Sequence, residues 1–576
     1  MHKKSFLQVK KNLKKDFSGF KKLKLAILGD SSTQFLNIAI RGLAYDYNLN
    51  LDIWEADYDQ IPLQVFDTNS DLYSFNPDVI LIFKSSHKLL QKYNSNNKDE
   101  LTSFADIHFN DIKNIYSKLS ENINSKIIFY NYTEINDFIF GNYANKVESS
   151  FIFQLRKINY LLMDFSTTAS NFFICDLSSI QNQIGKENLF HPSSYINNSM
   201  ALSIEVLPLV AKNTLDIIKA FNGRFNKCII LDLDNTTWGG IIGDDGVEKV
   251  QIGNLGIGKA FTEFQLWVKK LKNRGIIIAI CSKNTENVAK EPFKKHPDMV
   301  LKLEDISVFV ANWENKADNI RYIQQILNIG FDSMVFIDDN PFERNIVREN
   351  LPDVCVPEMP EDPAEYLEYL YSQNLFETTS FSNEDSDRTK KYQIESERVA
   401  AKKKYTNEAD FLKSLNMTSN ILAFNNFNTP RISQLSQRSN QFNLRTIRYN
   451  EEDVYSIIES DKYFGFTFDL KDKFGEHGLI CVLVLKEISD DTLFIENWLM
   501  SCRVLKRGME KFTLNYLANF SKKHSYKFVV GEYIKTQKNS LVKNHYSDLG
   551  FEKINEKWRL NLCNYSELNT NIVELN

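Results

Sequence analysis

The stretch Ile230-Leu-Asp-Leu-Asp-Asn-Thr-Thr-Trp-Gly-Gly240 decides how the central part of this chain folds. The apolar run from Cys228 to Leu231 predicts a buried strand, and Asp232 and Asp234 follow it. In extended chain, residues two apart point to the same side, so we expect both carboxylates together at the strand end. A hard dication such as Mg²⁺ relieves the repulsion between two such acids, because it prefers oxygen ligands. A solvated acidic strand end is the alternative that this stretch alone leaves open.

Three later segments supply a context for these acids. Ile276-Ile-Ile-Ala-Ile-Cys-Ser-Lys-Asn284 predicts a second strand, which ends in the hydroxyl of Ser282. Lys316 begins an amphipathic stretch with helical spacing, and Met334-Val-Phe-Ile-Asp-Asp-Asn-Pro341 predicts a third strand ending in Asp338 and Asp339. Strands alternating with helices indicate a parallel sheet, which binds ligands at the carboxyl ends of its strands. Each polar group alone is compatible with an ordinary surface residue, but their order favours a phosphoryl-transfer site.

The amino-acid sequences of these segments are more specific than the spacing of their polar groups. LDLDNTTWGGIIGDDG, AICSKN, NWENKADNI and VFIDDNPFERNIV resemble the FkbH-like family of the haloacid dehalogenase (HAD) superfamily. The resemblance covers roughly residues 220 to 555 and departs at Thr237, where the family typically has Leu. It implies an enzyme that removes the phosphates of 1,3-bisphosphoglycerate. The glyceryl group then passes through an enzyme cysteine to the phosphopantetheine thiol of an acyl carrier protein.

The resemblance gives each polar group a role. Asp232 is expected to attack phosphorus, with Asp234 as the general acid and base. Mg²⁺ is expected to bind Asp232, the main-chain carbonyl of Asp234, Asp338 and Asp339, the last directly or through water. The phosphate oxygens are expected to contact four residues that follow the strands, namely Ser282, Lys283, Asn284 and Lys316.

An acyl-enzyme intermediate needs an accessible cysteine thiolate, activated by nearby positive charge or by a helix N-terminus. Cys281 lies beside the phosphate-binding Ser282, and Cys502 lies next to Arg503, so these two are the candidates. Burial of both thiols is the rival interpretation, because a free cysteine behaves as a small apolar residue. The remaining cysteines lie mostly in apolar runs and are expected to be buried: Cys175, Cys228, Cys355, Cys481 and Cys563.

Composition limits the class of protein. A chain of 576 residues is too long for one core and predicts roughly two to four domains. A net charge of −5 gives no nucleic-acid signature, and seven cysteines without paired spacing argue against disulfides or zinc. We expect no transmembrane segment and a cytoplasmic location, because no apolar run approaches membrane-spanning length. The lysine-rich start predicts a solvated helix face, with contact to anionic lipid as the alternative.

The amino-terminal third predicts another α/β domain. Leu23-Lys-Leu-Ala-Ile-Leu-Gly-Asp-Ser-Ser-Thr33 resembles the nucleophile segment of SGNH hydrolases, with Ser31 as nucleophile and His191 as base. Asn188 stands where that family has the aspartate that orients its histidine, so His191 is expected to be a poor base. We therefore favour a hydrolase-like scaffold used for binding over an active esterase.

The carboxyl-terminal part resembles a GNAT acyltransferase domain. Strands around residues 466–470, 478–485, 492–500 and 528–531 predict an antiparallel meander. A basic, glycine-containing turn then begins a helix, an arrangement that binds pyrophosphate through main-chain N–H groups. It is expected to bind coenzyme A or a carrier protein's pantetheine arm through Arg503, Lys506, Arg507, Gly508 and Asn539. A helix start without a ligand is the alternative.

The fold class is therefore multidomain α/β. We expect an SGNH-like domain over residues 1–220, a HAD-like domain over 221–365, a helical connector over 366–415 and a GNAT-like domain over 416–576. The leading functional hypothesis is a Mg²⁺-dependent phosphatase and acyltransferase that loads a glyceryl group onto a carrier protein. The second is a phosphatase for another metabolite, such as a sugar phosphate, joined to a coenzyme A-dependent acetyltransferase. In the third, the flanking domains only bind or position partners.

Overall fold

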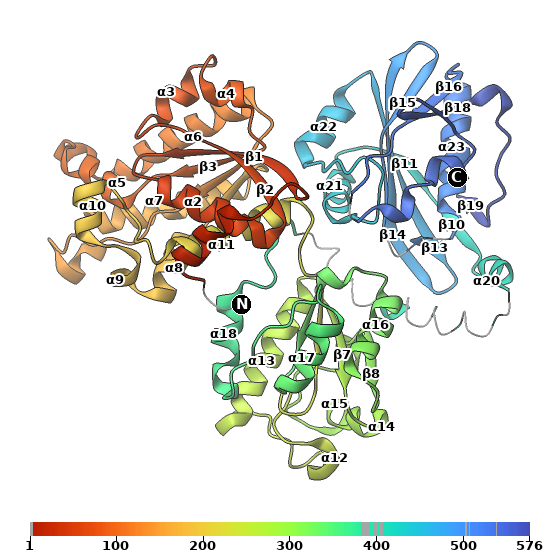
Figure 1. Ribbon diagram of the computed structural model, residues 1–576, viewed down its shortest axis with the longest axis horizontal. Helices are drawn as coiled ribbons and strands as arrows, with labels where there is room; N and C mark the ends of the chain where they lie inside the picture. Colours follow the sequence, from red (N-terminus) through yellow and green to blue (C-terminus); the bar gives the residue numbers. More distant parts are fainter. Residues whose placement is uncertain are drawn as a thin grey trace. The chain divides into compact units, whose positions relative to one another are not determined.

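The computed structural model describes residues 4–381, 392–394, 398, 401, 405, 407–501, 504–505, 507–536 and 538–575. The chain divides into two compact units, Met1–Lys219 and Ala220–Asn576. Figure 1 labels the helices and strands of both units. Parallel sheets with helices between their strands confirm the multidomain α/β class.

The first unit contains one parallel sheet of five strands, in the order β2-β1-β3-β4-β5. This is the order of a doubly wound sheet, with the reversal of strand order beside β1. The strands are β1 (Lys21–Gly29), β2 (Leu49–Glu55), β3 (Val79–Phe83), β4 (Lys126–Tyr130) and β5 (Phe172–Cys175). The helices are α1 (Phe6–Lys11), α2 (Gln34–Leu43), α3 (Ile61–Phe66), α4 (Asp71–Phe75), α5 (Ser86–Asn94), α6 (Phe104–Asn122), α7 (Phe151–Ser166), α8 (Leu177–Ile184), α9 (Lys186–Leu189), α10 (Pro192–Asn198) and α11 (Leu207–Phe221).

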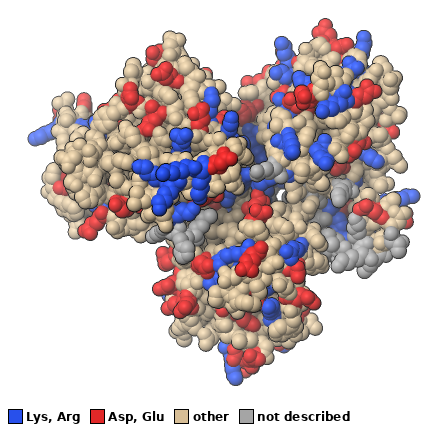
Figure 2. All heavy atoms as spheres, viewed as in Figure 1, with Lys and Arg blue, Asp and Glu red and all other residues tan. Residues whose placement is uncertain are grey.

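The lysine-rich start of the chain is a short docked helix. Phe6 and Val9 of α1 are buried, whereas Lys10 and Lys11 are exposed. Figure 2 shows Lys and Arg side chains gathered over the region of α1 and α2. The apolar side of α1 packs inward and the basic side faces outward, as expected for a solvated helix face.

The central sheet belongs to the second unit and is also parallel, in the order β8-β7-β6-β9. Its strands are β6 (Cys228–Leu231), β7 (Ile277–Ser282), β8 (Val308–Ala311) and β9 (Met334–Ile337). Its helices are α12 (Ile242–Asp245), α13 (Gly256–Asn273), α14 (Glu286–Ala289), α15 (Glu291–Lys295), α16 (Lys316–Leu327), α17 (Pro341–Asn350) and α18 (Tyr366–Gln373). Strand β8 was not predicted from the sequence, because its apolar run of four residues is short.

Both faces of this sheet are buried, because its strands alternate between two cores. Ile229 and Ile278 pack with Phe261 of α13, whereas Cys228 and Ala279 pack with helix α16 on the other face. Tyr366 and Leu370 of α18 belong to the α13 core. The start of the connector expected from residue 366 therefore packs with the central sheet, and its part at 382–391 lies outside the described residues.

The carboxyl-terminal sheet is mixed, with β17-β18-β16-β15-β14-β13-β10-β19 as its main path. Strands β13, β14 and β15 form the expected antiparallel meander, but β16 pairs with β15 in parallel. The expectation of an antiparallel fourth strand was wrong, because α23 connects β15 to β16 as a crossover, which returns the chain in the same direction. The strands are β10 (Met417–Ser419), β11 (Ile421–Ala423), β12 (Phe442–Asn443), β13 (Tyr463–Asp472), β14 (Gly475–Ser489), β15 (Thr492–Met500), β16 (Phe528–Gly531), β17 (Glu552–Ile554), β18 (Lys557–Asn561) and β19 (Ile572–Glu574). The helices are α20 (Glu408–Ser414), α21 (Thr429–Arg438), α22 (Glu451–Glu459), α23 (Met509–Lys523) and α24 (His545–Asp548).

Candidate functional site

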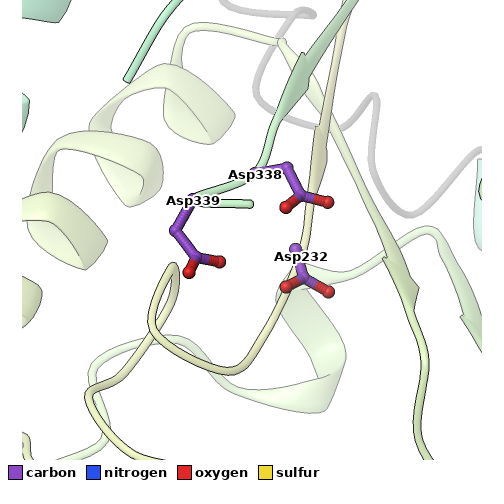
Figure 3. Close-up of side chains that lie close together, drawn as sticks. All are labelled: Asp232, Asp338 and Asp339. Carbon is purple, nitrogen blue, oxygen red and sulfur yellow. The ribbon is translucent and has the colours of Figure 1, made fainter. Parts of the chain in front are cut away.

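Three carboxylates meet at the carboxyl ends of β6 and β9. Asp232 follows β6, while Asp338 and Asp339 follow β9, which pairs with β6 in parallel register. One oxygen of each carboxylate lies within 4.8 Å of the others, and Figure 3 shows the three side chains turned toward one another. Asp232 and Asp338 are buried. Burial, together with the charge of Asp232, raises the pKa of the Asp338 carboxyl above its usual range.

Lys316 brings one positive charge to these acids. Its Nζ lies 2.9 Å from Oδ1 of Asp232 and donates to Oδ2 of Asp338 at 2.5 Å. Burial by itself lowers the pKa of Lys316, but the two carboxylates outweigh it and hold the pKa above its usual range. Three acids against one lysine leave an excess of negative charge with oxygen donors, which fits a hard dication such as Mg²⁺.

Two threonines in the loop after β6 hold the acids in place. Oγ1 of Thr237 donates to the main-chain oxygen of Asp232 at 2.6 Å. Oγ1 of Thr236 donates to Oδ1 of Asp339 at 3.1 Å and accepts from the N–H of Asp339 at 3.0 Å. The position where the chain departs from the family pattern, Thr237, therefore has a structural contact of its own. The role of Thr236 was not predicted, because its partner is more than a hundred residues away in sequence.

Asp234 faces a different set of partners from Asp232. Its Oδ1 accepts from Nε1 of Trp238 at 3.0 Å and from the N–H of Ile242 at 3.1 Å, and its Oδ2 accepts from Nδ2 of Asn284 at 2.9 Å. Burial raises the pKa of Asp234, against these hydrogen bonds. Its carboxylate is not one of the three clustered acids, so its predicted metal contact rests on the main-chain carbonyl and stays a prediction.

The end of β7 contributes the predicted phosphate-binding groups. Nδ2 of Asn284 donates to Oγ of Ser282 at 3.2 Å as well as to Asp234, so one amide joins two functional groups. The ammonium of Lys283 instead bonds to Oε1 of Glu343 in α17 at 2.6 Å. The structure thus brings Ser282 and Asn284 to Asp234, whereas Lys283 is engaged in an ion pair that the sequence did not reveal.

Cys281 does not have the exposure that an acyl-carrying thiol needs. Its side chain is fully buried in the core beneath α16 and bonds to the main-chain oxygen of Lys316 at 3.8 Å. Burial raises the pKa of this thiol well above its usual range, which argues against the expected role. The other candidate, Cys502, lies outside the described residues. Cys563 is exposed, contrary to expectation, because it lies in a surface turn after β18.

The basic turn before α23 lies only partly in the described chain. Gly508 precedes the helix with a φ of +85°, which favours glycine, and Arg507 is buried with NH1 3.0 Å from Nε2 of His477. Asn539 is fully buried; its amide donates to the main-chain oxygens of Asn443 and Ile534. These contacts favour structural roles for Arg507 and Asn539 over the predicted ligand contacts. Arg503 and Lys506 lie outside the described residues.

The structure does not pair the two predicted hydrolase residues of the first unit with each other. Ser31 is buried, and its Oγ donates to Oδ1 of Asp30 at 3.1 Å. His191 is exposed and shares a hydrogen bond of 2.9 Å between Nδ1 and Oγ of Ser193. Asn188 bonds to the main-chain oxygen of Ile184 instead of orienting the histidine. Ser31 bonds to Asp30 and His191 to Ser193, so the predicted nucleophile and base are not coupled to each other in the described chain, which argues against esterase chemistry.

Comparisons with known proteins match this architecture. The family model for the FkbH N-terminal domain matches residues 24–219. The crystal structure of the N-terminal part of protein BF1531 from Bacteroides fragilis, described as containing a phosphatase domain complexed with Mg, is 56% identical. The match covers 66% of this chain and 100% of that chain, with a TM-score of 0.63. The fold and site thus define a HAD-type α/β protein. Within that superfamily, the chain belongs to the FkbH-like family.

More distant matches involve N-acetyltransferases. The ribosomal-protein-S18-alanine N-acetyltransferase from Escherichia coli is 14% identical, covering 25% of this chain and 94% of that chain, with a TM-score of 0.21. Spermidine N-acetyltransferase from Vibrio cholerae is 12% identical, covering 26% of this chain and 96% of that chain, also with a TM-score of 0.21. No curated protein sequence gave a match. In the described part of the chain, none of the helices combines the length and apolar character that crossing a membrane requires.

Proposed function

We propose that this protein is a Mg²⁺-dependent phosphatase of small phosphorylated metabolites, with Asp232 as its nucleophile. The observation that carries the proposal is the buried cluster of Asp232, Asp338 and Asp339 with Lys316 between two of the acids. Support also comes from the 56% identical relative, which was crystallised with Mg. Mg²⁺ would be held by Asp232, Asp338, Asp339 and the main-chain carbonyl of Asp234. When bound, it would neutralise negative charge on the phosphate.

The proposed reaction consists of two displacements at phosphorus. A carboxylate oxygen of Asp232 attacks phosphorus, the bond to the leaving oxygen breaks, and Asp234 gives that oxygen a proton. Asp234 then removes a proton from water, which attacks the aspartyl-phosphate and releases phosphate with Asp232 restored. Lys316 and Ser282 stabilise the charge on the phosphoryl oxygens during both steps. The raised pKa of Asp234 suits a group that must hold a proton in the first step.

The test is phosphate release by Asp232→Asn. We expect activity to fall to background, because an amide is a poor nucleophile and removes one charge from the cluster. Asp244→Asn changes an exposed residue of α12, so it is the matched control and should keep full activity. Substantial Mg²⁺-dependent activity in Asp232→Asn would overturn the assignment of the nucleophile.

For the substrate, we propose 1,3-bisphosphoglycerate, with transfer of the glyceryl group to an acyl carrier protein. The proposal rests on family membership and leaves Cys502 as the acyl-carrying candidate, because the Cys281 thiol is buried. Incubation with 1,3-bisphosphoglycerate and a pantetheinylated carrier protein, followed by mass spectrometry, tests it. A glyceryl mass gain on the carrier, lost in Cys502→Ala and kept in Cys281→Ala, is expected. Phosphate release without mass gain would favour a phosphatase of another metabolite, joined to a coenzyme A-dependent acetyltransferase.

For the first unit, we propose a hydrolase-like scaffold that binds rather than hydrolyses. The separate hydrogen bonds of Ser31 to Asp30 and of His191 to Ser193 favour this reading. An esterase assay of the full chain beside Ser31→Ala tests it. Ester hydrolysis that disappears in Ser31→Ala would contradict the proposal.

A further inference from the structure

Arg344 of α17 reaches back to the main chain that carries two of the clustered acids. Its NH1 donates to the main-chain oxygen of Asp338 at 2.9 Å and to that of Asp339 at 2.6 Å. The residue is buried, with 5% of its surface exposed. A planar guanidinium bonded to two successive carbonyls fixes the orientation of both peptide groups.

The other edge of the guanidinium is held by Glu358. Nε and NH2 of Arg344 donate to Oε2 of Glu358 at 3.1 and 3.0 Å. The segment that carries Glu358 runs beside β9, because Cys355 pairs with Val335 in a parallel bridge. The arginine is therefore oriented from one side by a carboxylate and bonded on the other side to the acid pair.

Other contacts hold the two carboxylates themselves, and the ion pair of Asp338 with Lys316 is one of them. Oδ1 of Asp338 accepts from the N–H of Asn340 at 2.9 Å, and Asp339 bonds to Thr236. Residues 338 to 340 lie between the end of β9 and the start of α17, where neither regular element holds the backbone. The bonds from Arg344 supply a constraint at that point.

We infer that Arg344, oriented by Glu358, is a positioning residue that sets Asp338 and Asp339 for binding of the dication. This inference rests on the proposed Mg²⁺-dependent function. Groups that orient metal ligands without touching the metal typically change its affinity about 10- to 100-fold when removed. Arg344 acts through the main chain of the ligands. Its loss should therefore weaken the binding of Mg²⁺, and the packing of the core away from the site should stay as it is.

Calorimetric titration of the full chain with Mg²⁺ tests the inference. Arg344→Met should bind Mg²⁺ about 10- to 100-fold more weakly, and Arg344→Lys should be weakened less, since its ammonium keeps the charge and can still donate. Glu358→Gln should shift the affinity in the same direction by a smaller factor. Arg321→Met is the matched control, because Arg321 bonds to the main-chain oxygen of Asn350 at the other end of α17. Its affinity for Mg²⁺ should equal that of the wild type.

Phosphate release as a function of Mg²⁺ concentration gives a second measurement. High Mg²⁺ should restore much of the activity of Arg344→Met if positioning of the ligands is its main loss. Unchanged Mg²⁺ affinity in a folded Arg344→Met would overturn the inference, whatever its activity. If Arg344→Met does not fold, Glu358→Gln and Arg344→Lys test the inference in its place. Unchanged Mg²⁺ affinity in both of these variants would overturn the inference. Failure of the wild type to bind Mg²⁺, by contrast, would contradict the proposed function itself.

Discussion

At the scale of single residues, Asn284 joins the proposed acid-base group to the phosphate-binding hydroxyl. Its Nδ2 donates to Oδ2 of Asp234 and to Oγ of Ser282, and its side chain is buried. Asn284→Ala should lower kcat for phosphate release roughly 10- to 100-fold, because small errors in orientation cost rate without removing the reacting groups. Steady-state kinetics at saturating Mg²⁺ measure the effect, with a thermal melt to show that the variant is folded. A kcat within twofold of the wild type would show that Asp234 needs no such support.

Asp30 makes a separate residue-scale prediction about pH. Burial raises its pKa from 3.8 to about 6, although the N–H of Ser85 and the hydroxyl of Ser31 both donate to it. The folded state therefore binds a proton more tightly than the unfolded state, and the stability contribution falls as pH rises from 4 through 6. Above pH 6, Asp30→Asn should be more stable than the wild type, by on the order of 1–3 kcal/mol. The difference should vanish below pH 4.

Thermal denaturation between pH 4 and 8 measures this effect. Ser31→Ala is the comparison, because it removes one hydrogen bond to Asp30 but no charge, so it should keep the fall in stability with rising pH. A lower stability of Asp30→Asn at pH 7 would mean that the ionised carboxylate is required by the fold.

At the scale of elements, sequence periodicity predicted the positions of strands better than it predicted which side chains and main-chain atoms meet. Strand β6 has the predicted bounds, because it is an apolar run with polar residues beyond its end. Asp232, Ser282 and Asp338 could be predicted as one site for the same reason. Arg344 and Thr236 could not, because their roles depend on which main-chain atoms tertiary packing brings near. The burial of Cys281 depends on which face of β7 meets α16, which alternation alone left ambiguous.

The packing of α1 on α2 gives an element-scale prediction. A Cβ added to Gly42 would lie 2.4 Å from the main-chain oxygen of Val9, so only glycine allows this close approach. Nδ2 of Asn12 also donates to the oxygen of Gly42, which ties the two helices at the same point. Gly42→Ala should release α1 and lower the stability of the first unit by about 1–3 kcal/mol. Gly19→Ala is the control, because a Cβ there meets nothing within 4 Å.

Limited proteolysis followed by mass spectrometry measures the release of α1. Cleavage among the lysines of the first fifteen residues should become faster in Gly42→Ala and stay unchanged in Gly19→Ala. Equal cleavage in both variants would show that α1 tolerates a shift away from α2.

At the scale of the whole molecule, the residues of the proposed phosphatase site come from one unit. Asp232, Ser282 and Asp338 lie at the ends of strands of the central sheet, and Lys316 begins α16. Their hydrogen-bond partners described above also fall within Ala220–Asn576. The cores on both faces of that sheet are likewise formed by residues of this unit. The first unit has its own sheet and its own core. Neither fold therefore requires strands from the other.

We therefore expect a fragment of residues 220–576 to fold and to release phosphate with a kcat within about threefold of the full chain, because a compact unit with its own core can fold alone. Circular dichroism, Mg²⁺ titration and phosphate release measure the fragment beside the full chain. Asp232→Asn in the fragment is the control for contaminating phosphatase. A folded fragment that binds Mg²⁺ but releases no phosphate would mean that the first unit takes part in binding the substrate. A fragment with full phosphatase activity and no transfer to the carrier protein would instead assign the first unit to recognition of that partner.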